Sequence, residues 1–275
     1  MILTYTVRDL TPYISWPYFY HTWRVPPRSD EAARLKADAD TWLAEHADAD
    51  CVEGIFRLCP ACADGDNLRI EHTLFPLLRQ QVPHADGSPL LCLSDFVRPC
   101  TDAGGEPADT VGLFATTCHT RLEEAEAATG DPYRRLLAQS LSDRLAEAAA
   151  EKMHEYVRRT AWGYAPDERL TTEQLLREEY QGIRPAVGYP SLPDQSVGFL
   201  LNDLLHLEQI GITLTENGAM HPHASVSGLM LSHPASRYFA VGPIGDDQLH
   251  DYARRRGLPV AEMRKFLAAN LPQET

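Results

Sequence analysis

Residues 52–75 read VEGIFRLCPACADGDNLRIEHTLF, with two apolar stretches separated by the polar segment ADGDN at residues 63–67. Branched and aromatic residues in both stretches favour β-strands, and the central Asp-Gly pair is typical of a hairpin turn. A hairpin joins neighbouring strands in antiparallel order. The segment therefore predicts two antiparallel strands.

Helical patterns lie on both sides of this hairpin. A helix is expected over residues 30–47 behind Ser29-Asp30, and the longest helix is expected to begin at Asp131-Pro132 and to run to about Trp162. Shorter helices are predicted at 171–180, 196–211, 246–257 and 260–270, further strands at 111–118, 212–217 and 237–244, a short helix or strand at 90–99, and a glycine-rich surface loop at 101–110. Because there is no regular βαβ rhythm, the predicted fold class is α+β with an antiparallel sheet.

Charge and hydropathy exclude several classes of protein. The 275 residues carry a formal net charge of −14, which argues against nucleic acid as a partner. No apolar run reaches the 18 residues that a membrane span needs, and the N-terminal MILTYTVRDLTPY lacks the order of a signal peptide. We therefore expect a cytoplasmic protein with no membrane association.

The six cysteines are too sparse for a disulfide framework, and in a reducing compartment we expect all of them to be thiols. Cys59 and Cys62 have the spacing of a redox motif or of half a zinc site, but no second pair of ligands stands nearby. We interpret this CPAC motif as coincidence. The other four are interpreted as ordinary core or surface residues: Cys51, Cys92, Cys100 and Cys118.

Residues 182–190, GIRPAVGYP, are expected to form a loop that carries function, because Pro185, Gly188 and Pro190 disfavour a helix or a central strand. The guanidinium group of Arg184 in such a stiff loop suits bidentate binding of a carboxylate or phosphate. The alternative is a surface arginine paired with Glu178 or Glu179. Gly188 would let a ligand approach the backbone, and Tyr189 offers a ring and a hydroxyl.

Three histidines, His221, His223 and His233, lie in the stretch AMHPHASVSGLMLSHP at residues 219–234. Three imidazoles suggest a metal site, but no cysteine or acidic residue lies among them, so we interpret them as loop residues and predict no metal. Tyr238-Phe239 could stack on a heteroaromatic ring or belong to the core.

The segments GIRPAVGYPSLPD (182–194) and LTENGAMHPHASVSGLMLSHPASRYFAVGPIGDDQLHDYARRRG (214–257) closely resemble the activation domain of cobalamin-dependent methionine synthase. Further matches are LRQQ (78–81), CLSDFVRP (92–99), DRLAEAAAEKMHEYVRR (143–159), WGYAPDE (162–168) and REEYQGIRP (177–185), so the resemblance extends from about Ile14 to Leu271. It implies one C-shaped α+β domain, residues 1–275, with a bent antiparallel sheet and flanking helices.

The same resemblance implies that the domain binds S-adenosylmethionine and helps to restore methylcobalamin from cob(II)alamin. The cobalamin would be carried by a partner module, and a flavodoxin-type protein would supply the electron. No residue is expected to act as a catalytic acid, base or nucleophile, because the reduced cobalamin is the nucleophile and the sulfonium is already activated.

The family pattern R-x-x-x-G-Y falls on Arg184, Gly188 and Tyr189, so Arg184 would hold the carboxylate of the methionine moiety. Ala186 and Tyr238-Phe239 would line the adenosyl pocket. Glu147 and Glu178 match two family carboxylates near the sulfonium, where opposite charge is favourable.

Two positions depart from the family pattern. Ser15 stands where the family usually has an aspartate that contacts the methyl donor, and Gln195 stands where it commonly has histidine. The first departure predicts weaker binding, and the second puts in doubt how this loop meets the cobalamin module. Homocysteine, folate and cobalamin modules are absent ahead of Met1, so the chain is either a natural subunit acting in trans or an excised domain. The two departures favour the first.

Two other functions are consistent with the sequence. One is a regulatory binding module that kept the fold and the partner surface but lost the methyl donor, which Ser15 favours. The other is a redox or metal protein that uses CPAC or the histidines.

Overall fold

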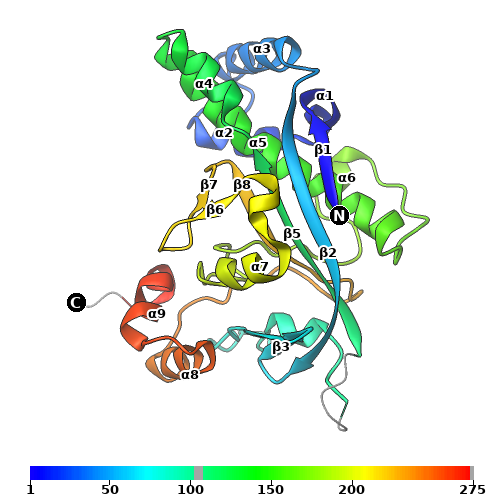
Figure 1. The fold of residues 1–275 in the computed structure, drawn as a ribbon, viewed down its shortest axis with the longest axis vertical. Helices are drawn as coiled ribbons and strands as arrows, with labels where there is room; N and C mark the ends of the chain where they lie inside the picture. Colours follow the sequence, from blue (N-terminus) through cyan, green and yellow to red (C-terminus); the bar gives the residue numbers. More distant parts are fainter. Residues whose placement is uncertain (102–107, 273–275) are drawn as a thin grey trace.

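The centre of the fold is an antiparallel sheet (Figure 1), here described from a computed structural model that covers residues 1–101 and 108–272. Its strands lie in the order β4-β3-β2-β5-β8, and β1 also pairs with β2. The bounds are β1 Ile2–Thr6, β2 Asp50–Asp64, β3 Asn67–Ile70, β4 Thr73–Pro76, β5 Asp109–Cys118 and β8 Ser225–Met230. A second small sheet pairs β6 (Thr213–Leu214) with β7 (Met220–His221).

The long strand β2 pairs with three other strands of this sheet. Its 15 residues pair with β1 at one end and with β3 at the other, while β5 runs along the opposite edge from Val52 to Ala61. The predicted hairpin is confirmed, because Asp64 pairs with Asn67 across the turn. Its second stretch is divided between β3 and β4, which pair with each other.

Helices surround the sheet, and most begin at the residues that the sequence indicates. The bounds are α1 Val7–Leu10, α2 Trp16–Thr22, α3 Asp30–Glu45, α4 Arg121–Ala128, α5 Pro132–Tyr156, α6 Thr172–Leu176, α7 Val197–Leu205, α8 Asp246–Arg256 and α9 Val260–Phe266. Side chains of Ser29, Asp131 and Thr171 accept hydrogen bonds from the first turns of α3, α5 and α6. Helices α1, α2 and α4 and strands β1, β7 and β8 have no counterpart among the predicted elements. No helix within the described ranges is long and apolar enough to span a membrane.

Several predicted elements differ in type from the prediction over part of their length. Helix α5 continues as a π-helical turn, Val157–Ala161, which accounts for the predicted length to about Trp162. The helix expected to end at Gly211 consists of α7 and a 3₁₀ turn, Leu207–Ile210. The segment 90–99 contains only a 3₁₀ turn, Leu93–Phe96, and the loop predicted at 101–110 falls mainly outside the described residues.

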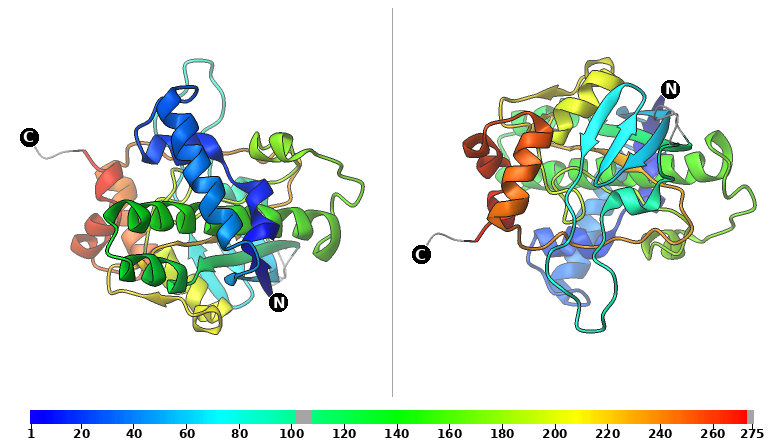
Figure 2. Two further views of the ribbon diagram at one scale, coloured as in Figure 1. Left: turned by 90° about the horizontal axis from the view of Figure 1, so that it is seen from above. Right: turned by 90° about the horizontal axis from the view of Figure 1, so that it is seen from below.

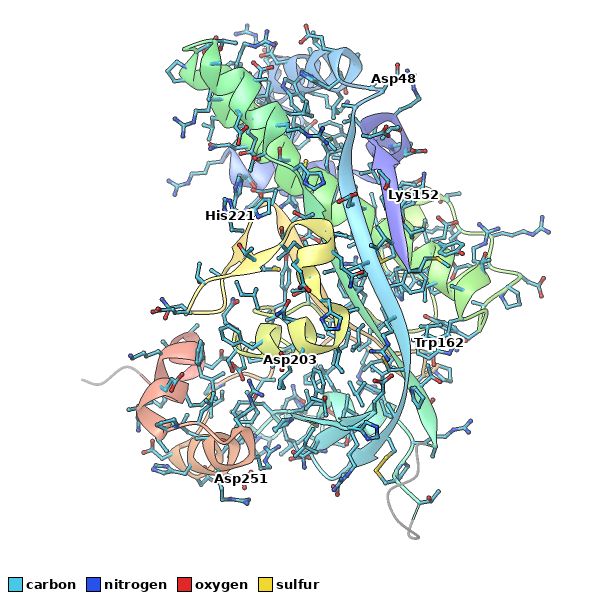
Figure 3. The ribbon with its side chains drawn as sticks, viewed as in Figure 1. Asp48, Lys152, Trp162, Asp203, His221 and Asp251 are labelled. Atoms are coloured by element: carbon cyan, nitrogen blue, oxygen red, sulfur yellow. A yellow bond between two sulfur atoms is a disulfide. The ribbon has the colours of Figure 1, made fainter. Side chains whose placement is uncertain are left out.

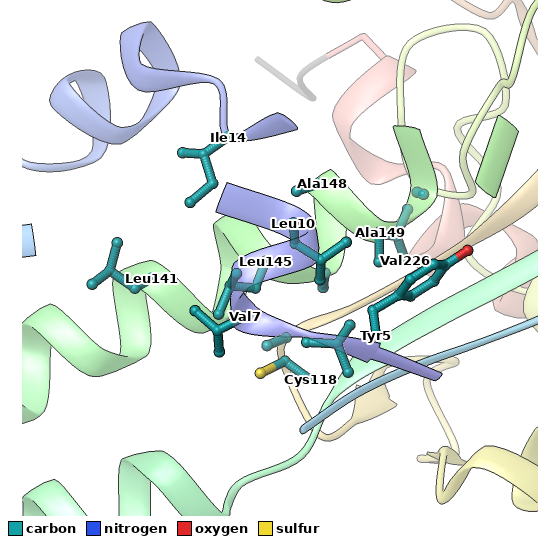
Figure 4. Packing of buried hydrophobic residues seen from close by; sticks show 14 of the residues in the cluster. Tyr5, Val7, Leu10, Ile14, Cys118, Leu141, Leu145, Ala148, Ala149 and Val226 are labelled. Atoms are coloured by element: carbon teal, nitrogen blue, oxygen red, sulfur yellow. The ribbon is translucent and has the colours of Figure 1, made fainter. Parts of the chain in front are cut away.

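Apolar side chains on the two faces of the sheet form separate clusters. On one face, Leu141 and Leu145 of α5 pack with Val7 and Leu10, as Figure 4 shows. On the other face, Leu113 of β5 packs with residues of α7 and of the 3₁₀ turns. Helices α8 and α9 add a third cluster beside β4, at the end of the molecule away from α3 (Figure 2). Long helix α5 therefore lies against one face of the sheet, where it presents its side chains to neighbouring loops.

The prediction of a strand at residues 237–244 is wrong. One edge of β8 pairs with β5, and the other is occupied by residues 183–187, so this segment cannot pair with β8. Its backbone bonds elsewhere: the Val241 amide donates to the Pro190 carbonyl at 2.9 Å, and the Ala240 carbonyl accepts from Gln80 at 2.9 Å.

The prediction that all six cysteines are thiols is also wrong. Cys62 at the end of β2 forms a disulfide with Cys100, visible as a yellow bond in Figure 3. The two residues are 38 positions apart in the sequence, but pairing of Ala63 with Pro99 brings their Cα atoms to 4.8 Å. Cys59 stays a buried thiol, and burial raises its pKa to about 11. CPAC is thus neither a CxxC disulfide nor a zinc half-site.

Candidate functional site

The segment that contains Arg184 forms backbone hydrogen bonds with the edge of β8 that does not pair with β5. Amides of Leu229 and Leu231 donate to the carbonyls of Pro185 and Ile183 at 3.0 and 2.9 Å, and the Val187 amide donates to Ser227 at 2.8 Å. Pro185 needs no amide proton here, because only its carbonyl faces β8. The segment is therefore an extended edge segment and not a free loop.

Gly228 of β8 permits this close approach. A Cβ atom at Gly228 would lie 2.1 Å from the Pro185 carbonyl oxygen and 2.8 Å from the Cα of Ala186. Any other residue would push the Arg184 segment away from the sheet. The amide of Arg184 points away from β8 and donates to the Tyr238 hydroxyl at 2.9 Å.

Two side-chain contacts join this segment to α5. Arg184 Nη2 lies 3.1 Å from Glu151 Oε2, and both side chains are about nine-tenths buried. One helical turn away, the Tyr189 hydroxyl donates to Glu147 Oε1 at 2.5 Å. Burial is the largest single effect on Arg184 and would lower its pKa. Glu151 and the smaller contributions of Tyr238, Tyr180 and Glu147 together outweigh burial and raise that pKa, so the guanidinium stays charged.

Between α5 and this segment lies a cavity of about 510 Å³. Eight of the nine predicted site residues line it: Ser15, Glu147, Glu178, Arg184, Ala186, Tyr189, Tyr238 and Phe239. The volume suits a small organic ligand. The alternative pairing of Arg184 with Glu178 or Glu179 is not formed, because the guanidinium bonds Glu151 instead.

Gly188 does not line the cavity. Its φ of +84° favours glycine, and a Cβ atom there would lie 2.2 Å from Nε2 of Gln195. The structure thus explains this glycine by the turn and by its contact with Gln195.

Charged groups of both signs surround the cavity. Arg184 and Arg144 line it together with the carboxylates of Glu147, Glu151 and Glu178. Glu178 is an exposed residue of the lining, yet partial burial and the nearby Glu151 raise its pKa. This arrangement can bind a ligand that carries a carboxylate together with one or more positive charges.

The predicted histidines lie outside this cavity. Nε2 of His223 is 3.6 Å from Asp143 and 3.7 Å from Glu123, and the His233 ring lies beside Phe96. Within residues 1–101 and 108–272, no group of three or more His, Cys, Asp or Glu side chains is arranged to hold a metal ion.

Comparison with known proteins assigns this chain to a family. Residues 6–257 match the family model described as the activation domain of vitamin B12 dependent methionine synthase. The chain belongs to this family. It is also similar to the crystal structure of the MetH reactivation domain bound to AdoHcy, with 38% sequence identity and a TM-score of 0.89 over 100% of this chain and 90% of that chain.

Sequence reasoning missed Glu151 in this activation domain, although a signal was present. The charged residues of α5 and its π turn recur at intervals of three and four, which places them on one helical face: Arg144, Glu147, Glu151, His154 and Arg158. The first three line the cavity, whereas His154 and Arg158 are fully buried below it. Burial, reinforced by Arg158 and Arg184, lowers the pKa of His154, so its ring is neutral at pH 7.

Proposed function

We propose that this activation domain binds S-adenosylmethionine in the cavity between α5 and residues 184–190 and presents its methyl group to a cobalamin carried by another module. The observation that carries the proposal is the buried Arg184 guanidinium, which stays charged in the cavity beside three carboxylates. S-adenosylmethionine has one carboxylate, one ammonium and one sulfonium, so its charges match these groups.

In this proposal Arg184 holds the carboxylate of the ligand, and Glu147 and Glu178 face the sulfonium. Ala186, Tyr238 and Phe239 contact the adenosine moiety. One electron from a flavodoxin-type donor reduces cob(II)alamin, and transfer of the methyl group then yields methylcobalamin and S-adenosylhomocysteine. The chain contributes position and electrostatics to this transfer and no acid, base or nucleophile.

The surface around the cavity suits a protein partner. Tyr18, Leu176 and Tyr189 line the cavity although 66%, 37% and 49% of their surfaces are exposed. A second hollow of about 190 Å³ adjoins it, with Val187 on one side and residues 223–226 on the other. The segments 185–194 and 219–228 therefore flank one continuous concave surface, which we propose as the docking site of the cobalamin module.

A regulatory module that has lost the methyl donor is not favoured as the function. The family membership and the similarity to a reactivation domain bound to AdoHcy both argue for retained ligand binding. Among the predicted site residues that line the cavity, only Ser15 departs from the family pattern that the resemblance implies.

Reactivation in trans tests the proposal. The protein is mixed with S-adenosylmethionine, a chemical reductant and a cob(II)alamin-loaded synthase that lacks its activation domain, and the visible spectrum is followed. We expect the spectrum of methylcobalamin to appear only when both the protein and S-adenosylmethionine are present. If the spectrum stays that of cob(II)alamin while calorimetry detects a complex between the two proteins, the chain is a regulatory binding module instead.

Replacement of Ser15 by aspartate is expected to tighten binding of S-adenosylmethionine about tenfold in titration calorimetry. Ser15 lines the cavity, and a carboxylate there would make a charge-assisted contact with the ligand ammonium. Ser15 is also the N-cap of α2 and makes no capping bond, so the uncharged Ser15→Asn serves as control. An equal gain with asparagine would mean that the helix cap, and not the charge, is responsible.

A further inference from the structure

Only one of the two carboxylate oxygens of Glu151 accepts a hydrogen bond from a described residue. Oε2 accepts from Arg184 Nη2 at 3.1 Å, whereas Oε1 is buried and has no hydrogen-bond partner among the described residues. Glu151 lines the ligand cavity, although only 7% of the residue is exposed. Buried carboxylate oxygens are almost always hydrogen-bonded, so a donor from a ligand is expected at this oxygen.

The contact between Arg184 and Glu151 fixes where such a donor would come from. In an α-amino acid, the carboxylate and the ammonium are attached to the same carbon atom. A carboxylate bound to Arg184 therefore places its ammonium within a few ångströms of any acid that touches the same guanidinium, and Glu151 is that acid.

We propose that Glu151 Oε1 accepts a hydrogen bond from the α-ammonium of the methionine moiety of S-adenosylmethionine. This inference rests on the proposed function. The resemblance assigns a contact with the donor to an aspartate where this chain has Ser15, and Glu151 supplies the negative charge that serine lacks.

The other two carboxylates of the cavity are less suited to this contact. Oε1 of Glu147 already accepts from the Tyr189 hydroxyl, and Glu178 is exposed, so water competes for its carboxylate. A charge-assisted bond is stronger where water is excluded. Glu151 combines burial, contact with Arg184 and a free oxygen.

Titration calorimetry with two ligands tests the assignment: S-adenosylmethionine and its deaminated analogue, in which hydrogen replaces the α-ammonium. The wild-type protein is expected to prefer S-adenosylmethionine by about 10- to 100-fold. Glu151→Gln keeps an oxygen that can accept from Arg184 but removes the charge. It should weaken binding of S-adenosylmethionine by about that factor and leave binding of the analogue within about threefold of wild type.

Glu178→Gln is the matched control, because it removes a carboxylate that the proposed function places opposite the sulfonium, which both ligands carry. Any loss of affinity should therefore be equal for the two ligands, and the preference for S-adenosylmethionine should remain. If Glu151→Gln weakens both ligands equally, Glu151 only positions Arg184 and the inference is overturned. Equal binding of both ligands by the wild type would also overturn it while leaving the proposed function intact. Failure of the wild type to bind either ligand would instead reject the proposed function.

A crystal structure of the wild-type protein with S-adenosylmethionine gives a second readout that does not depend on the folding of any variant. The ammonium nitrogen is expected within about 3.2 Å of Glu151 Oε1. An ammonium that bonds only Ser15 or Glu178 would assign the contact to those residues and overturn the inference.

Discussion

Replacement of Arg184 by alanine is expected to weaken binding of S-adenosylmethionine by at least about 30-fold, measured by titration calorimetry. The side chain is only 10% exposed, and its guanidinium is held by Glu151 at 3.1 Å and lies 5.5 Å from the centre of the Phe114 ring. Removing a buried partner of a charged group typically costs about 2–5 kcal/mol, which corresponds to about 30- to 5,000-fold in affinity. In the reactivation assay, methylcobalamin should no longer form at micromolar ligand.

The controls for this prediction separate charge from geometry and binding from folding. Arg184→Lys keeps the charge but not the planar pair of donors, so intermediate affinity is expected. Arg177→Ala removes an exposed arginine that pairs with Glu173 on α6, and it should bind like the wild type. Arg184→Ala leaves Glu151 buried without a partner, so titrations are done well below its melting temperature. Binding within threefold of wild type would show that the cavity does not hold the ligand carboxylate.

Replacement of Arg158 by methionine is expected to lower the melting temperature by about 6–20 °C. Arg158 is fully buried, donates from Nε and Nη2 to the two oxygens of Glu168 at 2.9 and 2.7 Å, and stacks on Tyr180 at 4.0 Å. Methionine would leave the Glu168 carboxylate buried and unpaired, which costs about 3–5 kcal/mol. For a protein of this size, each kcal/mol shifts the midpoint by about 2–4 °C.

The next residue in the chain supplies the control for this prediction. Arg159 forms a partly exposed pair with Glu155, and Arg159→Met should shift the melting temperature by no more than about 2 °C. The double variant Arg158→Met, Glu168→Leu removes both charges and should recover much of the loss. A midpoint for Arg158→Met as close to wild type as that of Arg159→Met would mean that the buried pair does not stabilise the fold.

Local features of the sequence were sufficient to predict where most elements begin and how the first strands pair. These features act over only a few residues, so they can be recognised without knowledge of the fold. They are the capping side chains at Ser29, Asp131 and Thr171, the Asp64-Gly65 turn and the apolar stripe of α5. The resemblance to a family added the site residues, and the structure brings eight of them to one cavity.

Other features depend on which distant segments the fold brings together. Arg184 meets Glu151 across 33 residues and Cys62 meets Cys100 across 38, and no local signal specifies either pair. Residues 183–187 occupy the edge of β8 because Gly228 has no side chain, and this keeps residues 237–244 from pairing with β8 despite their strand-like sequence. The sequence thus determined most of the elements through short-range hydrogen bonding and hydrophobic periodicity. Only the tertiary structure decided the partner of Arg184. A buried charged side chain is stabilised by an opposite charge beside it, and the fold determines which residue supplies that charge.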